Sequence, residues 1–318
     1  MLNNRNLPGR LMSKLLGKLH TDDDSGLLSN QYKPVMSDEA KSKYYMETHK
    51  LQQCHVNQWN SFSQKVDFRG KRVLELGGSN MPSELLLDDL GAEKYVCIDK
   101  VMPYQLNMWE EHYSKIKMYE KEELSLNDAL NNFDHICYRM FGEEITDDFV
   151  EQFDVCVSLN CLEHVKTMDE TLFNVHKSLK PGGVFIANFG PVFSCECGSH
   201  FYWRNECNFN NLGPLSPFPH LLLSFDEIVE RLRTAFPETH IGEITHAAYG
   251  VKKGAHNYVN ELFFEDYEVY LKHSPFQKFS IRPFWKTAVA PQTYKALRKR
   301  FPQYRRFDVY AVELIAIK

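Results

Sequence analysis

The feature that most constrains the fold is a short apolar segment that ends in paired glycines. Residues 71–76 predict a buried strand, and Gly77-Gly78 lets the backbone turn tightly where a ligand can approach. Residues 83–90 then predict a helix, residues 94–98 predict a second strand, and Asp99 follows directly. In a doubly wound sheet, an acid about 20 residues after the glycine turn can accept the ribose hydroxyls of a nucleoside. The segment therefore predicts a nucleoside-binding unit.

The spacing of the glycines argues against a dinucleotide, which needs G-x-G-x-x-G to place a pyrophosphate on a helix amino terminus. Glu75 precedes Gly77 by two residues, and a carboxylate there repels a pyrophosphate but suits a cation. The stretch resembles motif I of the Rossmann-like S-adenosylmethionine-dependent methyltransferases, whose cofactor carries an ammonium and a sulfonium and no phosphate. Ser79 stands where that family has its second glycine, and Gly78 comes one position early.

Two further stretches resemble the same family. Residues 153–159 predict a buried strand that runs into residues 160–165, Asn-Cys-Leu-Glu-His-Val, which is similar to the family's segment after strand four. Residues 179–183 turn the chain into a fifth strand at 184–188, again as in the family. Three motifs in this order make the resemblance specific. The alternative is a Rossmann-like fold that binds no cofactor.

The resemblance implies an α/β fold with a doubly wound, seven-stranded Rossmann-like sheet, whose last strand is antiparallel and lies beside strand five. We expect a third strand near residues 135–138, a helix at 225–235 and a strand near 240–246. The expected regions are a helical N-terminal extension or lid (1–65), a Rossmann-like cofactor-binding core (66–246), a helical insertion that shapes the substrate pocket (247–306) and the final core strand (307–318).

The resemblance also implies a set of cofactor-binding residues, which follow the predicted strands. Glu143 is expected to receive the adenine amino group, with Glu144 as its rival. The full set comprises Glu75, Gly77, Gly78, Ser79, Asp99, Glu143 and Asn160.

A metal ion is not expected. Some family members hold a divalent ion with Glu-x-x-Glu-His, but here Asn160 occupies the first position before Glu163-His164, and asparagine is a poorer ligand for a hard cation. Cys195-Glu196-Cys197 lacks a second pair of ligands, so free cysteines are the preferred interpretation.

Methyl transfer is an in-line displacement in a dry pocket, and an alcohol acceptor also needs a base. His200 and His220 are the candidate catalytic bases, because histidine titrates near neutrality and both lie in the loop expected to cover the methyl group. The alternative for each is a histidine that hydrogen-bonds to the loop backbone.

The sequence constrains the methyl acceptor less than it constrains the cofactor. Residues 198–203 and 217–222 resemble methyltransferases of bacterial surface-polysaccharide pathways, which implies O-methylation of a sugar, glycan or other small metabolite. Tyr202, Trp203 or Phe218 would then stack on the sugar ring, and basic residues within 295–306 could hold a phosphate of the sugar carrier. The alternatives are a small-molecule N-methyltransferase and a non-catalytic, cofactor-binding regulatory subunit.

Composition limits the partners. The 318-residue chain has a net charge of -5, which argues against a nucleic-acid partner because phosphate backbones demand excess lysine and arginine. Its eight scattered cysteines fit a reducing cytoplasm, and the sequence predicts no stable membrane insertion. Nothing in the sequence indicates an oligomeric state.

Overall fold

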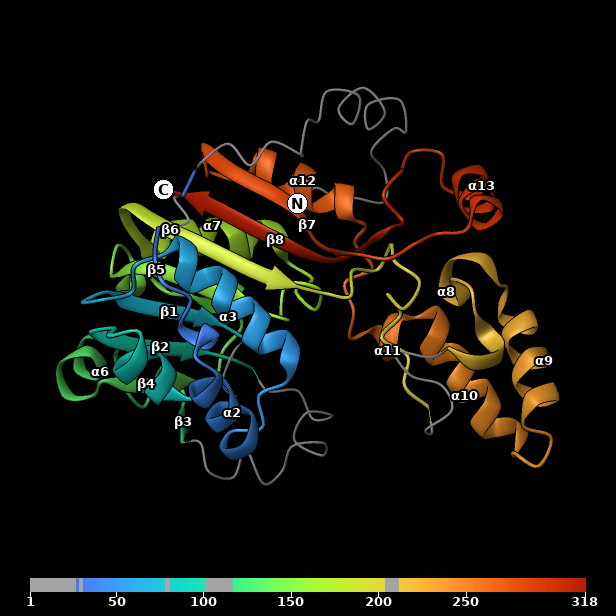
Figure 1. The fold of residues 1–318 in the computed structure, drawn as a ribbon, viewed down its shortest axis with the longest axis horizontal. Coiled ribbons are helices and arrows are strands. Elements are labelled where there is room, and N and C mark those ends of the chain that lie inside the picture. The colour runs from blue at the N-terminus through green and yellow to red at the C-terminus, as the bar shows by residue number, and fades with distance from the viewer. Residues whose placement is uncertain (1–26, 29–30, 78–80, 101–116, 204–211) are drawn as a thin grey trace.

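The computed structural model describes residues 27–28, 31–77, 81–100, 117–203 and 212–318, and Figure 1 shows their arrangement. The strands form one sheet with the order β3-β4-β2-β1-β5-β6-β8-β7. The strands are β1 (Arg72–Leu76), β2 (Lys94–Ile98), β3 (Met118–Tyr119), β4 (His135–Tyr138), β5 (Phe153–Leu159), β6 (Leu179–Phe189), β7 (Lys278–Lys286) and β8 (Val309–Ile317).

The order of the sheet confirms the predicted doubly wound α/β class. β1 lies in the centre and pairs in parallel with both β2 and β5. β8 runs antiparallel to both of its neighbours, β6 and β7, so the last strand lies beside the predicted fifth strand as expected. The described sheet has eight strands instead of seven, because the two-residue β3 adds to β4 at one edge.

Helices cover both faces of the sheet because apolar side chains project from both of its faces. Along β1, Leu74 and Leu76 join one apolar cluster and Val73 joins the other, as the alternation of a strand requires. The first face is covered by α6 (Leu126–Asn132), α7 (Met168–Ser178) and α12 (Phe264–His273). The second is covered by α2 (Glu39–Thr48), α3 (Gln53–Lys65) and the π-helix η3 (Leu85–Asp89).

A buried ionic cluster fixes α3 to the antiparallel edge of the sheet. Lys65 Nζ lies 2.5 Å from Glu313 Oε1, and Arg282 Nη2 lies 2.7 Å from the same oxygen. Burial alone would raise the pKa of Glu313, but the two cations and the Ser61 hydroxyl lower it, so the carboxylate is ionised. The N-terminal helices are therefore part of the packed structure.

A second lobe lies to one side of the sheet (Figure 1). Its main apolar core packs α9 against α10 around Ile228, Leu232, Ile244 and Ala248. The chain enters this lobe after β6, returns to the sheet as α12 and β7, and visits it again as α13 before β8. The helices of the lobe are η6 (Gly213–Leu215), α8 (Pro219–Leu222), α9 (Phe225–Ala235), α10 (Ile241–Lys252), α11 (Gly254–Asn257) and α13 (Pro291–Arg300).

The strand expected near residues 240–246 is wrong, because this segment lies in α10. Over the longer range, Ile244, Ala247, Ala248 and Val251 recur at helical spacing and are buried together. The penultimate strand is β7, more than 30 residues later, and the boundary expected at residue 246 falls inside the helix. The helix predicted at 225–235 is confirmed as α9, and the insertion expected to be helical contains α13.

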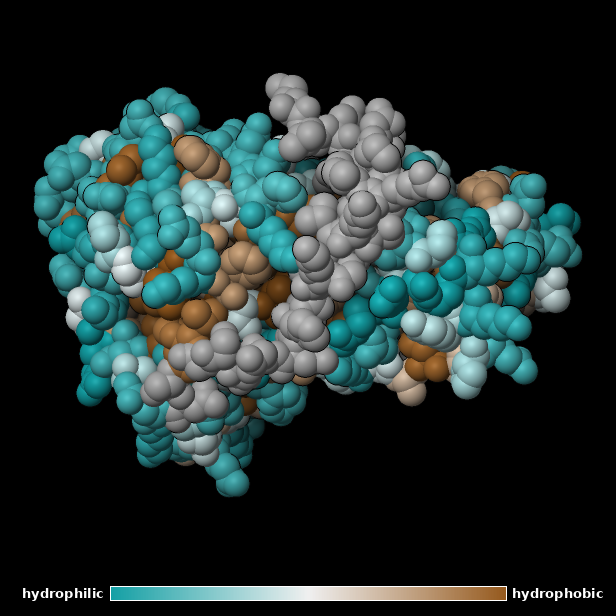
Figure 2. Space-filling model, turned by 90° about the horizontal axis from the view of Figure 1, so that it is seen from above, coloured by the Kyte–Doolittle hydropathy of each residue, from teal (hydrophilic) through white to brown (hydrophobic). Residues whose placement is uncertain are grey.

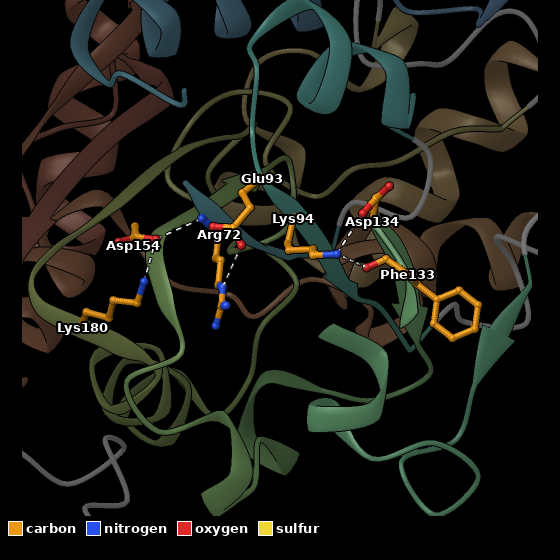
Figure 3. A network of polar contacts seen from close by, with 7 residues as sticks. All are labelled: Arg72, Glu93, Lys94, Phe133, Asp134, Asp154 and Lys180. Atoms are coloured by element: carbon orange, nitrogen blue, oxygen red, sulfur yellow. Dashed lines mark hydrogen bonds and ion pairs between the residues drawn. The ribbon is translucent and has the colours of Figure 1, made fainter. Parts of the chain in front are cut away.

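The amino-terminal edge of the sheet carries a network of paired charges, which Figure 3 shows from close by. Lys94 Nζ donates to Asp134 Oδ1 at 2.8 Å and to the carbonyl oxygen of Phe133 at 3.0 Å. Lys180 Nζ donates to Asp154 Oδ2 at 2.9 Å. The network tethers the starts of neighbouring strands, and its members are Arg72, Glu93, Lys94, Phe133, Asp134, Asp154 and Lys180.

The surface carries both apolar and hydrophilic side chains. In the view of Figure 2, apolar side chains gather on the half that carries the sheet, whereas the second lobe presents mainly hydrophilic atoms. No helix among the described residues is long and apolar enough to cross a membrane.

Candidate functional site

Four of the predicted cofactor residues meet at the carboxyl-terminal edge of the sheet. Glu75 and Gly77 belong to β1 and the turn after it, Asp99 follows β2, and Asn160 follows β5. The Gly77 N–H donates to the carbonyl oxygen of Ile98 at 2.8 Å, which joins the ends of β1 and β2. Gly78 and Ser79 lie outside the described residues. The convergence follows from the parallel pairing, because the ends of neighbouring parallel strands share one edge.

Gly77 is required by both its backbone and its surroundings. Its φ is +76°, a conformation that L side chains rarely adopt. A Cβ at this position would overlap the Sγ of Cys161 and lie 2.6 Å from its Cβ. The glycine turn and the segment after β5 therefore approach each other closely, and any side chain at Gly77 would separate them.

Glu75 is a buried carboxyl group at this edge. Its side chain is 0% exposed, Tyr95 donates a hydroxyl hydrogen bond to Oε2, and Oε1 has no hydrogen-bond partner among the described residues. Burial raises the pKa of Glu75 well above its usual value, although the bond from Tyr95 opposes this shift. No described lysine or arginine pairs with it, so a cationic ligand fits this environment and a pyrophosphate does not.

A network of side-chain amides fixes the residues that follow β5 and end β6. Gln58 of α3 donates from Nε2 to Asn160 Oδ1 at 2.7 Å and to Asn188 Oδ1 at 3.0 Å. The Asn160 N–H donates to the carbonyl oxygen of Asn188 at 2.9 Å, and Asn160 has a φ of +49°. The N-terminal helix α3 therefore contributes directly to the geometry of this edge.

Gln58 and Asn188 were not predicted as site residues. The available signal is that Gln58 is a polar residue in the buried stripe of α3 beside Trp59, and that Asn188 ends an apolar strand. Their partners lie more than 100 residues away along the chain, which sequence patterns do not reveal.

Glu143 lies in the short helix η4 (Gly142–Glu144), after β4, and is partly buried. Its rival Glu144 is occupied, because Glu144 Oε2 accepts the Phe141 N–H at 2.7 Å and lies 3.7 Å from Lys100 Nζ. The geometry therefore favours Glu143 over Glu144 for a ligand, while its contact with adenine stays a prediction.

His200 and His220 are both buried and lie beside the segment that leaves β6. His200 Nε2 donates to the carbonyl oxygen of Pro191 at 2.6 Å, and His220 Nε2 donates to that of Phe193 at 2.8 Å. Burial lowers the pKa of His200 to about 3 and that of His220 to about 4, so both rings are neutral near pH 7. The backbone contacts expected for the alternative role are present, and a catalytic role stays a prediction.

Glu163 is a second buried carboxyl group near this edge. Its side chain is 1% exposed, Oε1 accepts the Gly190 N–H at 3.1 Å, and Oε2 has no hydrogen-bond partner among the described residues. The neighbouring ring of His164 packs edge-on to that of His200, with centroids 5.0 Å apart. No group of three metal-ligating side chains occurs in the described part of the chain.

The aromatic and basic residues considered for a sugar carrier divide into exposed and occupied groups. Tyr202 is 61% exposed, whereas Phe218 is 1% exposed and packs in an apolar cluster, so Phe218 cannot stack on a ligand in this conformation. Among the basic residues, Arg298 and Arg300 donate to backbone carbonyl groups, and Arg306 pairs with Asp308.

Comparisons with known proteins identify one part of this architecture. Residues 109–185 match a family model described as a methyltransferase domain, and this segment includes β4, β5 and α7. The match covers less than half of the chain. The chain is an enzyme of the methyltransferase type. The match ends before His200 and His220, and it begins after the glycine turn and Asp99.

No curated protein matches the chain significantly. Among solved structures, it is similar to an S-adenosylmethionine-dependent methyltransferase from Mesorhizobium loti, at 11% identity over 80% of this chain and 93% of that chain, with a TM-score of 0.36. It is also similar to one from Archaeoglobus fulgidus, at 12% identity over 87% and 99%, with a TM-score of 0.41. These scores are too low to bear on the substrate.

Proposed function

We propose that this methyltransferase uses S-adenosylmethionine and methylates a hydroxyl group of a sugar, glycan or other small metabolite. The observation that carries the cofactor assignment is the convergence of Glu75, Asp99 and Asn160 around the positive-φ Gly77. This edge offers buried carboxyl groups, and no described lysine or arginine forms an ion pair with Glu75 or Glu163. A ligand with an ammonium, a sulfonium and ribose hydroxyls fits that chemistry.

Different residues of the chain would bind different parts of the cofactor. Asp99 would accept the ribose hydroxyls, Glu143 the adenine amino group, and Asn160 together with the glycine turn would hold the amino acid end. The cofactor supplies an electrophilic methyl group when bound. Residues 1–65 would cover the site, residues 66–246 would form most of the cofactor-binding core, and the second lobe would shape the acceptor pocket, with residues 307–318 as the closing strand.

The oxygen acceptor is supported by the polar groups near the exit from β6. Asn188 Nδ2, Ser199 Oγ and His220 Nδ1 are buried and have no hydrogen-bond partner among the described residues. Buried polar atoms are usually satisfied, so such a set favours a ligand rich in hydroxyl groups. His200 and His220 stay candidates for the base.

Calorimetric titration with S-adenosylmethionine and S-adenosylhomocysteine tests the cofactor. We expect micromolar binding that Asp99→Ala abolishes and that Asp134→Ala, an exposed acid at the opposite edge of the sheet, leaves unchanged. Absence of binding by the folded protein would refute the proposal.

Transfer of a radiolabelled methyl group to a panel of sugars and amines tests the acceptor. If His200 or His220 is the base for an oxygen acceptor, substituting both should abolish turnover while cofactor affinity persists. Turnover of amines that survives both substitutions would instead favour an N-methyltransferase. Binding without methylation of any acceptor, alone or with a partner protein, would favour a regulatory subunit.

A further inference from the structure

Glu163 is a buried carboxyl group with one oxygen that has no hydrogen-bond partner among the described residues. It follows β5 by four residues, in the same short segment as Cys161, which packs against Gly77. Its Oε1 accepts one backbone N–H, from Gly190 at the end of β6, and its buried Oε2 has no partner among the described residues. Glu163 Oε2 can therefore accept a further hydrogen bond or a proton.

The groups that face Glu163 do not neutralise it. On its own segment, Cys161 is partly buried, and His164 Nδ1 donates to the carbonyl oxygen of Tyr258 at 3.0 Å. Burial raises the pKa values of Tyr267 in α12 and Tyr310 in β8, and the charge of Glu163 adds to both shifts, so these phenols lie nearby. No described lysine or arginine forms an ion pair with Glu163.

We propose that Glu163 is the proton acceptor of the methyl-transfer reaction, and that it loses its own proton when the cationic cofactor binds. This inference rests on the proposed function. It assigns to a carboxyl group after β5 the role that the sequence suggested for His200 or His220.

The acid–base properties of the three candidates support this choice. Burial raises the pKa of Glu163 to about 8, so without a ligand the carboxyl group is mostly protonated at pH 7. A positive charge nearby would lower that pKa and ionise the group. His200 and His220, whose pKa values burial lowers to about 3 and about 4, are weak proton acceptors.

The proton balance of this cycle closes. Glu163 loses its proton to solvent as the sulfonium enters. During transfer the acceptor oxygen forms a bond to the methyl carbon, the bond between carbon and sulfur breaks with its electron pair passing to sulfur, and the hydroxyl proton passes to the Glu163 carboxylate. The sulfur in the product is neutral, so a protonated Glu163 is again the stable form. This balance is written for an alcohol acceptor, whose oxygen must lose its proton when it is methylated.

Proton release on binding tests the proposal without a known acceptor. Calorimetry at pH 7 in phosphate and in Tris, with EDTA present to exclude metal binding, gives the number of protons released. For a group with a pKa of about 8, we expect S-adenosylmethionine to release about 0.9 proton more than the neutral-sulfur product S-adenosylhomocysteine, because such a group is about nine-tenths protonated at pH 7.

Glu163→Gln should remove this difference while both ligands still bind. Glu265→Gln is the matched control, because Glu265 is also a buried carboxyl group with Oε1 bonded to backbone N–H groups and Oε2 unpartnered, but it lies at the start of α12 against residues 305–306. That variant should release protons as the wild type does.

Equal proton release by the two ligands in the wild type would overturn the proposal, as would an undiminished difference in Glu163→Gln. If the glutamine variant fails to fold, the wild-type difference and a Glu163→Asp variant decide. A folded wild type that binds neither ligand refutes the proposed cofactor itself, which is a separate and recognisable failure.

Discussion

Charged residues at the two edges of the sheet differ in burial and in whether they are paired. At the amino-terminal edge, Lys94 pairs with Asp134 and Lys180 pairs with Asp154, all in partial contact with water. Near the carboxyl-terminal edge, Glu75 and Glu163 are buried, lack a described cation and leave one oxygen unsatisfied. Unsatisfied buried groups cost stability, so the contrast separates an edge that supports the fold from one that is kept for a ligand.

The largest effect is expected where a buried carboxylate is fully compensated. Glu313→Gln removes the negative charge that faces the buried ammonium of Lys65, which should lower the free energy of unfolding by about 3–5 kcal/mol. Urea denaturation at pH 7 measures this loss. Glu163→Gln, which replaces a carboxyl group that is already mostly protonated, should cost far less. Equal losses would remove the distinction between compensated and uncompensated acids.

The next loss of stability is expected on alanine substitution of two glycines that have the same backbone conformation but lie at opposite edges of the sheet. Gly77 and Gly182 both have a φ of +76°, but only at Gly77 would a Cβ overlap Cys161, whereas nothing lies within 4 Å at Gly182. Gly182→Ala should cost about 1–2 kcal/mol from backbone strain alone, and Gly77→Ala about 1–3 kcal/mol more.

Thermal and urea unfolding of both alanine variants measure this difference, and calorimetry gives their cofactor affinity. Adding Cys161→Gly to Gly77→Ala should restore part of the loss, because it removes the atoms that the new Cβ would meet. Similar losses of stability in the two single variants would show that the close approach of Gly77 to Cys161 does not affect the free energy of unfolding.

The sequence was sufficient for the parallel core of the sheet. Its buried strands are short apolar runs bounded by turn residues, and the rule that their carboxyl ends share an edge was enough to bring Glu75, Asp99 and Asn160 together. A strand was expected at 240–246, whereas the helical spacing emerges only over the twelve residues of α10.

The contacts that complete the site could not be predicted, because they join residues far apart along the chain. Gln58 reaches Asn160 across 102 positions, and Lys65 reaches Glu313 across 248. The sequence drew attention to Glu163 but could not show that it is buried or that its Oε2 lacks a partner among the described residues. Both properties depend on packing against β6, α12 and β8.

A further effect is expected in the pH dependence of stability. Burial raises the folded-state pKa of Glu163 to about 8, above an unfolded value of about 4.3. Between these values the native state keeps a proton that the unfolded chain has lost, so this contribution is complete below about pH 4 and falls by up to about 1.4 kcal/mol per pH unit as pH rises to about 8.

Glu163→Gln should therefore lose less stability than the wild type between pH 6 and pH 8, as measured by urea denaturation. The amino-terminal edge should contribute with the opposite sign. Burial opposes ionisation of Asp154, but the Arg72 N–H and Lys180 lower its pKa, so its contribution is present at neutral pH and is lost in acid. Asp154→Asn should accordingly remove stability at pH 7 and little at pH 3.

The smallest effect is expected at an exposed ion pair. Asp134 is 74% exposed and its partner Lys94 keeps a second contact, with the carbonyl oxygen of Phe133. Asp134→Asn should change the free energy of unfolding by less than about 1 kcal/mol, and less still in 0.5 M salt, because water and ions screen such a pair. A loss of several kcal/mol would mean that the amino-terminal network holds the strand ends as firmly as the buried cluster around Glu313. The two edges would then differ in the exposure of their charges but not in their importance for the fold, and the unsatisfied acids near the carboxyl-terminal edge would still favour a ligand.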